Sequence, residues 1–129
     1  MMSTTLRTGF LGLATLLLFI GAAGNAFVIV PDLHGDLVEI GVRPTVLNTT
    51  VMALHASAMA SFGFAVIVLA ATIDAIRERP LARIPLAVVA AITMVQGVTA
   101  FSQTHSPHHF ASIAMSVLIA GALLVPSRL

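Results

Sequence analysis

The stretch from Phe101 to Phe110, FSQTHSPHHF, carries three histidines within five residues, in a chain otherwise dominated by apolar runs. Neutral imidazole is the commonest metal ligand in proteins, and it also serves as a general acid or base. His105, His108 and His109 could therefore ligate a transition metal or provide axial ligands to a haem. The alternative interpretation is that they are interfacial residues, with an apolar body and a polar tip, that mark where the chain leaves a membrane.

A second candidate group surrounds His55. Asn48, Met52, His55 and Met59 follow a 4-3-4 spacing, which places all of them on one face of a helix. Thioether and imidazole ligands on one stripe would suit Cu(I). Methionine is also a routine filler of packed cores, and a lone histidine there can be a structural hydrogen-bonding residue. His34 adds a fifth imidazole, with neighbouring carboxylates as partners.

The spacing suggests where these side chains would point. With Ser106 as N-cap and Pro107 at the first helical position, His108 and His109 occupy the first turn of a helix, where the helix dipole disfavours imidazolium. We expect His108 to point into a helix bundle at a depth comparable to that of His55. The pattern is compatible with an outer-face site for copper, zinc or haem b, but interfacial histidines explain it as well, since H-x-x-H-H is not a specific signature and no HExxH motif is present.

The composition indicates whether the chain folds in water or in a membrane. The 129 residues are 58% hydrophobic and only 9% charged, whereas about a quarter of the residues of a soluble domain are charged. We therefore interpret the chain as an integral membrane protein in contact with the lipid bilayer. The absence of cysteine excludes disulfides, iron–sulfur clusters and thiolate metal sites, and a formal net charge of +1 gives no reason to expect a nucleic-acid partner.

Four apolar runs, at about 8–30, 46–73, 84–102 and 108–126, are each near the 17–25 residues that cross a hydrocarbon core of ~30 Å. All six prolines lie at the edges of these runs, where helices begin or end. The sequence predicts a single all-α domain, a four-helix antiparallel transmembrane bundle with short loops and one longer outer loop at 31–45. The spacing of apolar residues in that loop could form a short helix lying on the membrane surface, which Gly35 and Gly41 disfavour.

The arginines predict the orientation. Five of the six lie at one end of the predicted bundle, and only Arg43 lies at the other. Under the positive-inside rule, both termini and the 74–83 loop are cytoplasmic and the histidines face outward. We expect a multi-pass cell-membrane protein, of the bacterial inner membrane. The segment ending in GAAGNA resembles a signal peptide, but hydrophobicity continues through FVIV, which favours an uncleaved helix.

Small and polar residues predict how the helices associate, because lipid tails remove the hydrophobic driving force between them. Ser112, Ser116 and Ala120 form a small-residue ridge at four-residue spacing. Asn25 and Gln96 are isolated amides of the kind that form interhelical hydrogen bonds, each worth about 0.6–2 kcal/mol. The same two amides could instead line a polar pocket.

Three functions are compatible with these patterns. The chain could be an accessory subunit of a membrane complex or a homo-oligomer, without chemistry of its own. It could bind a metal or haem, with His34, His55, His105, His108 and His109 as metal ligands and His55, His108, Asn25 and Gln96 as cofactor-binding residues. It could also hold a quinone, sterol or hydrocarbon between the helices, in a pocket that includes Gln103. If the protein is an enzyme, His55 could act as the general base in that pocket.

Overall fold

The computed structural model describes residues 2–126, and the predicted all-α class is confirmed. The elements are α1 (Met2–Gly24), the π-helical turn η1 (Asn25–Ile29), α2 (Val30–Glu39), α3 (Pro44–Ile76), α4 (Arg83–Thr104), the 3-10 turn η2 (Pro107–His109) and α5 (Phe110–Leu124). Four of its helices are long and apolar enough to cross a membrane. The protein is therefore a multi-pass membrane protein.

Residues 2–76 form a helical hairpin that is longer than the apolar runs. Helices α1 and α2 join through η1 into one continuous rod, 37 residues from Ser3 to Glu39. The π-helical turn has a simple cause: Pro31 lacks an N–H and its ring would collide with the carbonyl of residue 27 in a regular helix. Widening the turn, with the Val30 N–H bonded to the carbonyl of Asn25, allows the rod to continue. The short helix expected in the outer loop therefore exists, but it extends α1 instead of lying on the membrane surface.

The helices end in matched capping motifs. At the end of α2, Val42 N–H bonds the carbonyl of Leu37 while Gly41 adopts a φ of 74°. At the end of α3, Arg79 N–H bonds the carbonyl of Asp74 while Glu78 adopts a φ of 55°. Both are Schellman motifs, in which a left-handed residue stops the helix and satisfies its last carbonyls. Only the second places a side chain in that unfavourable conformation.

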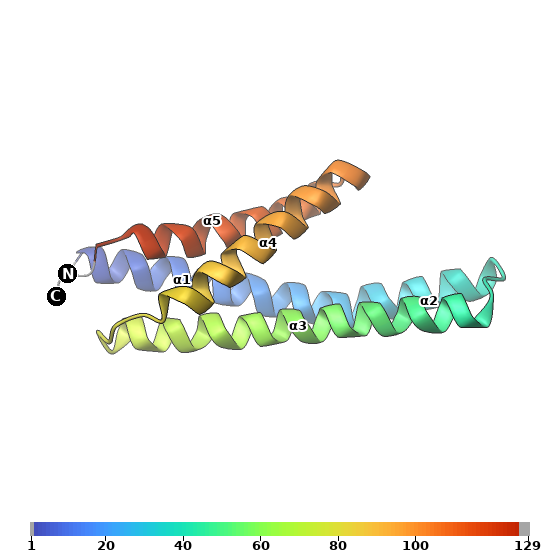
Figure 1. Cartoon of the computed structure of the whole chain (residues 1–129), viewed down its shortest axis with the longest axis horizontal. Helices are drawn as coiled ribbons and strands as arrows, with labels where there is room; N and C mark the ends of the chain where they lie inside the picture. Colours follow the sequence, from blue (N-terminus) through green and yellow to red (C-terminus); the bar gives the residue numbers. More distant parts are fainter. Residues whose placement is uncertain (1, 127–129) are drawn as a thin grey trace.

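The four helices share a core only near one end of the molecule. Helix α1 packs against both α3 and α5, and α5 packs against α4, whereas α3 and α4 make few contacts. Helix α1 begins, α5 ends and α3 connects to α4 at this same end, which we call the arginine end (Figure 1). The core residues are Leu11, Ala14, Leu18, Ala65, Val68, Ala71, Ala75, Leu86, Val89, Ala90, Met115, Ile119 and Ala122.

Away from the arginine end the molecule divides into two arms. Figure 1 shows the α4–α5 pair rising away from the α1–α3 hairpin. We call the outer part of that hairpin, residues 22–62, the long arm, and the outer part of α4–α5, residues 97–113, the short arm. Each arm stays packed within itself: Ala22, Val30 and Ala58 are buried in the long arm, and Gly97 is buried in the short arm.

Within residues 2–126, hydroxyl groups and one guanidinium, and no side-chain amide, form the hydrogen bonds between helices. Thr15 of α1 and Thr72 of α3 lie 3.1 Å apart at their Oγ1 atoms, and both are buried. Ser116 of α5 donates to the carbonyl of Ala90 in α4 at 2.6 Å. The predicted ridge therefore does contact a neighbouring helix through Ser116. At the arginine end, the Arg7 guanidinium of α1 donates to the carbonyl of Val125, which ties the first helix to the last.

Candidate functional site

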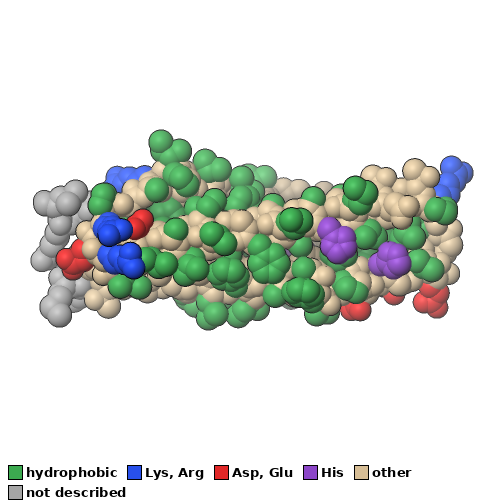
Figure 2. Space-filling model, turned by 90° about the horizontal axis from the view of Figure 1, so that it is seen from below, with side chains coloured by type: hydrophobic (Ala, Val, Ile, Leu, Met, Phe, Trp, Pro, Cys, Tyr) green, Lys and Arg blue, Asp and Glu red, His purple; other side chains and the backbone are tan. Residues whose placement is uncertain are grey.

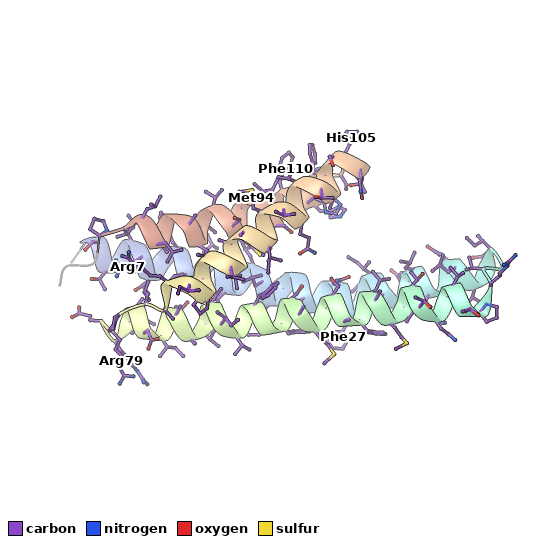
Figure 3. All side chains as sticks on the ribbon, in the orientation of Figure 1. Arg7, Phe27, Arg79, Met94, His105 and Phe110 are labelled. Atoms are coloured by element: carbon purple, nitrogen blue, oxygen red, sulfur yellow. The ribbon has the colours of Figure 1, made fainter. Side chains whose placement is uncertain are left out.

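The tip of the short arm carries three histidines in an aromatic setting. The rings of Phe101 and Phe110 lie 4.6 Å apart between centroids, which joins the end of α4 to the start of α5. His105 meets Phe101 edge to face at 5.9 Å and ends α4 in a left-handed conformation. Figure 3 shows His105 and Phe110 at this tip, far along the bundle from Arg7 and Arg79. The arrangement resembles an interfacial aromatic anchor in a chain without Trp or Tyr.

His108 and His109 form the closest imidazole pair. Their ring centroids are 4.0 Å apart, and Ser106 Oγ lies 2.6 Å from His108 Nδ1. Ser106 is the N-cap residue as predicted, but its side chain makes no cap hydrogen bond and holds His108 instead. The expectation that His108 points into the bundle is wrong, because its side chain is exposed. With Nδ1 occupied, Nε2 is the ring nitrogen left to face the surroundings.

The remaining histidines belong to the other arm. His34 lies on α2 and His55 on α3, and both are exposed. Figure 2 shows histidine side chains on the surface of the hairpin, away from the arginines that gather at one end. Within residues 2–126, no group of three or more His, Cys, Asp or Glu side chains is placed to hold a metal ion. Metal or haem ligation by these residues stays a prediction.

The helix face that carries Met52, His55 and Met59 points outward. Met52 and Met59 are 73% and 75% exposed, and His55 between them is also exposed. The alternative interpretation, in which these methionines fill a packed core, is therefore wrong. The physical reason is that α1 packs on the opposite face of α3, through Ala58, Ala65 and Val68, so the 4-3-4 stripe has no neighbouring helix.

The two candidate amides lie apart from each other. Asn25 is half-buried within η1, and Gln96 is exposed on α4. Gln96 contributes to an open groove of about 580 Å³, whose wall is formed along α4 by Ala91, Ile92, Val95, Gln96 and Thr99. That groove lies on the face of α4 opposite its contact with α5. It differs from the predicted pocket, which would be enclosed by all four helices and would include Asn25, His55 and Gln103.

Sequence reasoning missed an apolar surface at the end of the long arm. Val38 and Ile40 close the first half of the hairpin and Val46 opens the second, and their side chains are 53%, 74% and 52% exposed. Charged residues are interspersed with them, including Glu39 and Arg43. A signal was available, since apolar residues recur at 38 and 40, beyond the first predicted span, and at 46, where the second predicted span begins.

No known protein-family model, curated protein or solved structure matches this chain.

Proposed function

We propose that this protein is a non-catalytic accessory subunit of a membrane complex, and that it docks to its partner through the end of the long arm. The observation that supports this proposal is the exposed apolar surface of Val38, Ile40 and Val46, carried on a hairpin longer than a membrane requires. Contact with a partner, rather than chemistry within the chain, is the role that such a surface fits.

The lengths of the helices support the argument. At 1.5 Å per residue, the rods of 37 and 33 residues measure about 55 Å and about 50 Å. The hydrocarbon core is ~30 Å thick, and an ordinary helix tilt of about 20° shortens the vertical reach only slightly. Helix α4, with 22 residues, measures about 33 Å and matches the bilayer by itself. With the arginine end at one interface, roughly 20 Å of the long arm extends beyond the other.

Apolar side chains have different consequences on the two parts of the hairpin. Within the bilayer, exposed residues such as Val66 simply face lipid. Beyond the bilayer, exposed Val38, Ile40 and Val46 would face water, which favours their burial against a partner protein. The surrounding Asp36, Glu39 and Arg43 would then form the polar rim of the interface.

Gentle extraction followed by native mass spectrometry tests this function. Wild-type protein should give the mass of an assembly heavier than one chain. The double variant Ile40→Asp, Val46→Asp should give the mass of the free subunit, because charges replace the apolar contact. Val66→Ala is the matched control, since Val66 is similarly exposed on the same hairpin but at bilayer depth. A wild-type protein that is a stable single-chain species in its native membrane extract would refute the proposal.

A second candidate function is supported by the imidazole pair at the short-arm tip. The Ser106 contact fixes His108 with Nε2 outward, as a hydrogen-bonded partner of a metal ligand usually does, and His109 lies beside it at 4.0 Å. Two imidazoles would hold Cu²⁺ or Zn²⁺ with the remaining positions filled by solvent or by a partner chain. Haem ligation has less support, because two imidazole rings with centroids 4.0 Å apart are too close to lie on opposite faces of a haem plane.

Calorimetric titration of the purified protein with Zn²⁺ or Cu²⁺ tests the second function. The His108→Ala, His109→Ala variant should lose at least tenfold in affinity, a typical consequence of removing ligands or their supporting partners. His34→Ala and His55→Ala should bind like the wild type. An affinity that is equal in all variants would rule out the pair as a metal site.

A further inference from the structure

The connection between α3 and α4 gathers positive charge at the point where both helices leave the bilayer. Arg77, Arg79 and Arg83 lie within seven residues, and all three side chains are exposed. Among the described residues, none of them forms an ion pair with the nearby Asp74 or Glu78. Three guanidinium groups are therefore free to bind an anion.

This connection is a fixed structure. The Schellman motif closes α3 with hydrogen bonds from Arg79 N–H to the carbonyl of Asp74 at 2.8 Å and from Glu78 N–H to the carbonyl of Ala75 at 3.2 Å. Leu81 is half-buried and packs against the shared core. Anchoring the backbone on both sides of Arg79 lowers the entropy cost of presenting the guanidinium groups to a ligand.

The opposite end of the molecule gives the contrast. The α2–α3 connection begins with the same kind of motif, at the end of α2. The charged residues around it are Asp32, Asp36 and Glu39, with only Arg43 as a cation. Arg7 also lies at the arginine end, but its guanidinium is already engaged with the carbonyl of Val125. Among the described residues, the arginines of 77–83 are the exposed cations of this end, whereas carboxylates outnumber cations at the other end, so an anionic surface is favoured at one end only.

We infer that Arg77, Arg79 and Arg83 form a binding site for the headgroup phosphate of an anionic phospholipid. The planar guanidinium binds phosphate oxygens through two parallel hydrogen bonds, which an ammonium group cannot do. Basic residues beside the ends of transmembrane helices commonly bind anionic lipid headgroups. This site is independent of the contact surface on the long arm.

Lipid titration of the full chain in neutral detergent tests the inference, with phosphatidylglycerol as the probe and phosphatidylcholine as its zwitterionic counterpart. Each basic residue near an anionic surface contributes roughly fivefold in affinity. The triple variant Arg77→Gln, Arg79→Gln, Arg83→Gln should therefore lose between about tenfold and about 100-fold, with Asp74 and Glu78 setting the lower value. Arg43→Gln, the matched control at the other end, should stay within about twofold of the wild type.

Further variants and competitors distinguish lipid binding from the binding of a simple anion and from a folding defect. Replacing the three arginines by lysine should restore only part of the affinity, because the charge returns without the bidentate geometry. If the triple glutamine variant does not fold, each single variant should still lose roughly fivefold. Equal affinity for phosphatidylcholine, unchanged binding by the variants, or full displacement of the lipid by millimolar inorganic phosphate would each overturn the inference.

Discussion

The helices pack differently at the arginine end and in the outer half of this protein. At the arginine end, four helices share one core that includes Leu11, Leu86 and Ile119, each fully buried. In the outer half the two hairpins separate, and each is packed only within itself (Figure 1). Large apolar side chains are exposed in both halves, such as Leu16 and Phe27, so hydrophobicity by itself does not account for the difference.

Close approach between the two hairpins near the arginine end explains the difference. In a bilayer, helices associate where small residues allow backbones to approach and where polar groups pair between helices. The two hairpins meet where α1 lies beside α5, with Gly121 against Phe10 and the Arg7 guanidinium bonded to the carbonyl of Val125. Within residues 2–126, no hydrogen bond joins the long arm to the short arm beyond this region.

The largest effect is expected in the shared core. Ile119→Ala should reduce the free energy of unfolding by about 2 kcal/mol, because a fully buried side chain loses its packing contacts and leaves a cavity. Val117→Ala, two residues away and 56% exposed, should have little effect. Reversible unfolding in mixed micelles, followed by circular dichroism, measures both. Equal destabilisation by the two variants would remove the distinction between core and lipid-facing positions.

The close approach within the short arm predicts a nearly equal effect. A Cβ on Gly97 would lie 2.8 Å from Ile113 Cγ1 and 3.0 Å from the Ile113 backbone nitrogen. Gly97→Ala should therefore destabilise the protein by about 1–3 kcal/mol through overpacking. Gly63→Ala meets no atom within 4 Å and should be neutral or stabilising by up to about 1 kcal/mol, since alanine favours helix. The same unfolding assay compares them, and a tolerated alanine at position 97 would show that α4 and α5 are less closely packed.

The two capping motifs predict opposite signs. Glu78→Gly should stabilise the protein by about 1 kcal/mol, because a left-handed conformation costs a side-chain-bearing residue about that much. Gly41→Ala should destabilise it by a similar amount at the equivalent position of α2. Glu78→Gln controls for the lost charge and should have little effect on unfolding. The same sign of change for Glu78→Gly and Gly41→Ala would contradict the assignment of the motifs.

The smallest effect is expected at the threonine pair. Each hydroxyl has one proton, so one threonine donates across the helices while the other donates to a carbonyl of its own helix, as the contacts of Thr15 and Thr72 with Leu11 and Val68 allow. A double-mutant cycle with Thr15→Val and Thr72→Val should give a coupling of about 0.6 kcal/mol. A coupling of zero would mean that α1 and α3 associate through packing alone.

Much of the fold could be predicted because it depends on composition and local chemistry. Apolar runs gave the four spans, and the prolines gave several helix starts, including Pro44 and Pro107. The length of the first rod could not be predicted, because the charges of Asp32, Asp36 and Glu39 ended the apolar run while the helix continued through a π-helical turn.

The candidate site was harder to predict, because it depends on how the helices are arranged. Spacing placed Met52, His55 and Met59 correctly on one face, yet spacing alone cannot tell which face meets another helix. The pairing of His108 with Ser106 depends on side-chain geometry at a 3-10 turn. The histidines were expected at one rim, and the separation of the arms distributes them over two.

The central claim is that the hairpins join at the arginine end and separate outside it. Pulsed electron paramagnetic resonance in lipid nanodiscs tests it directly, with spin labels on exposed Met52 and Gln103 and a reference pair on exposed Ile76 and Leu124 near the arginine end. The outer pair should be clearly farther apart than the reference pair. A short, narrow outer distance, as expected for neighbouring helices about 10 Å apart at both ends, would contradict the claim.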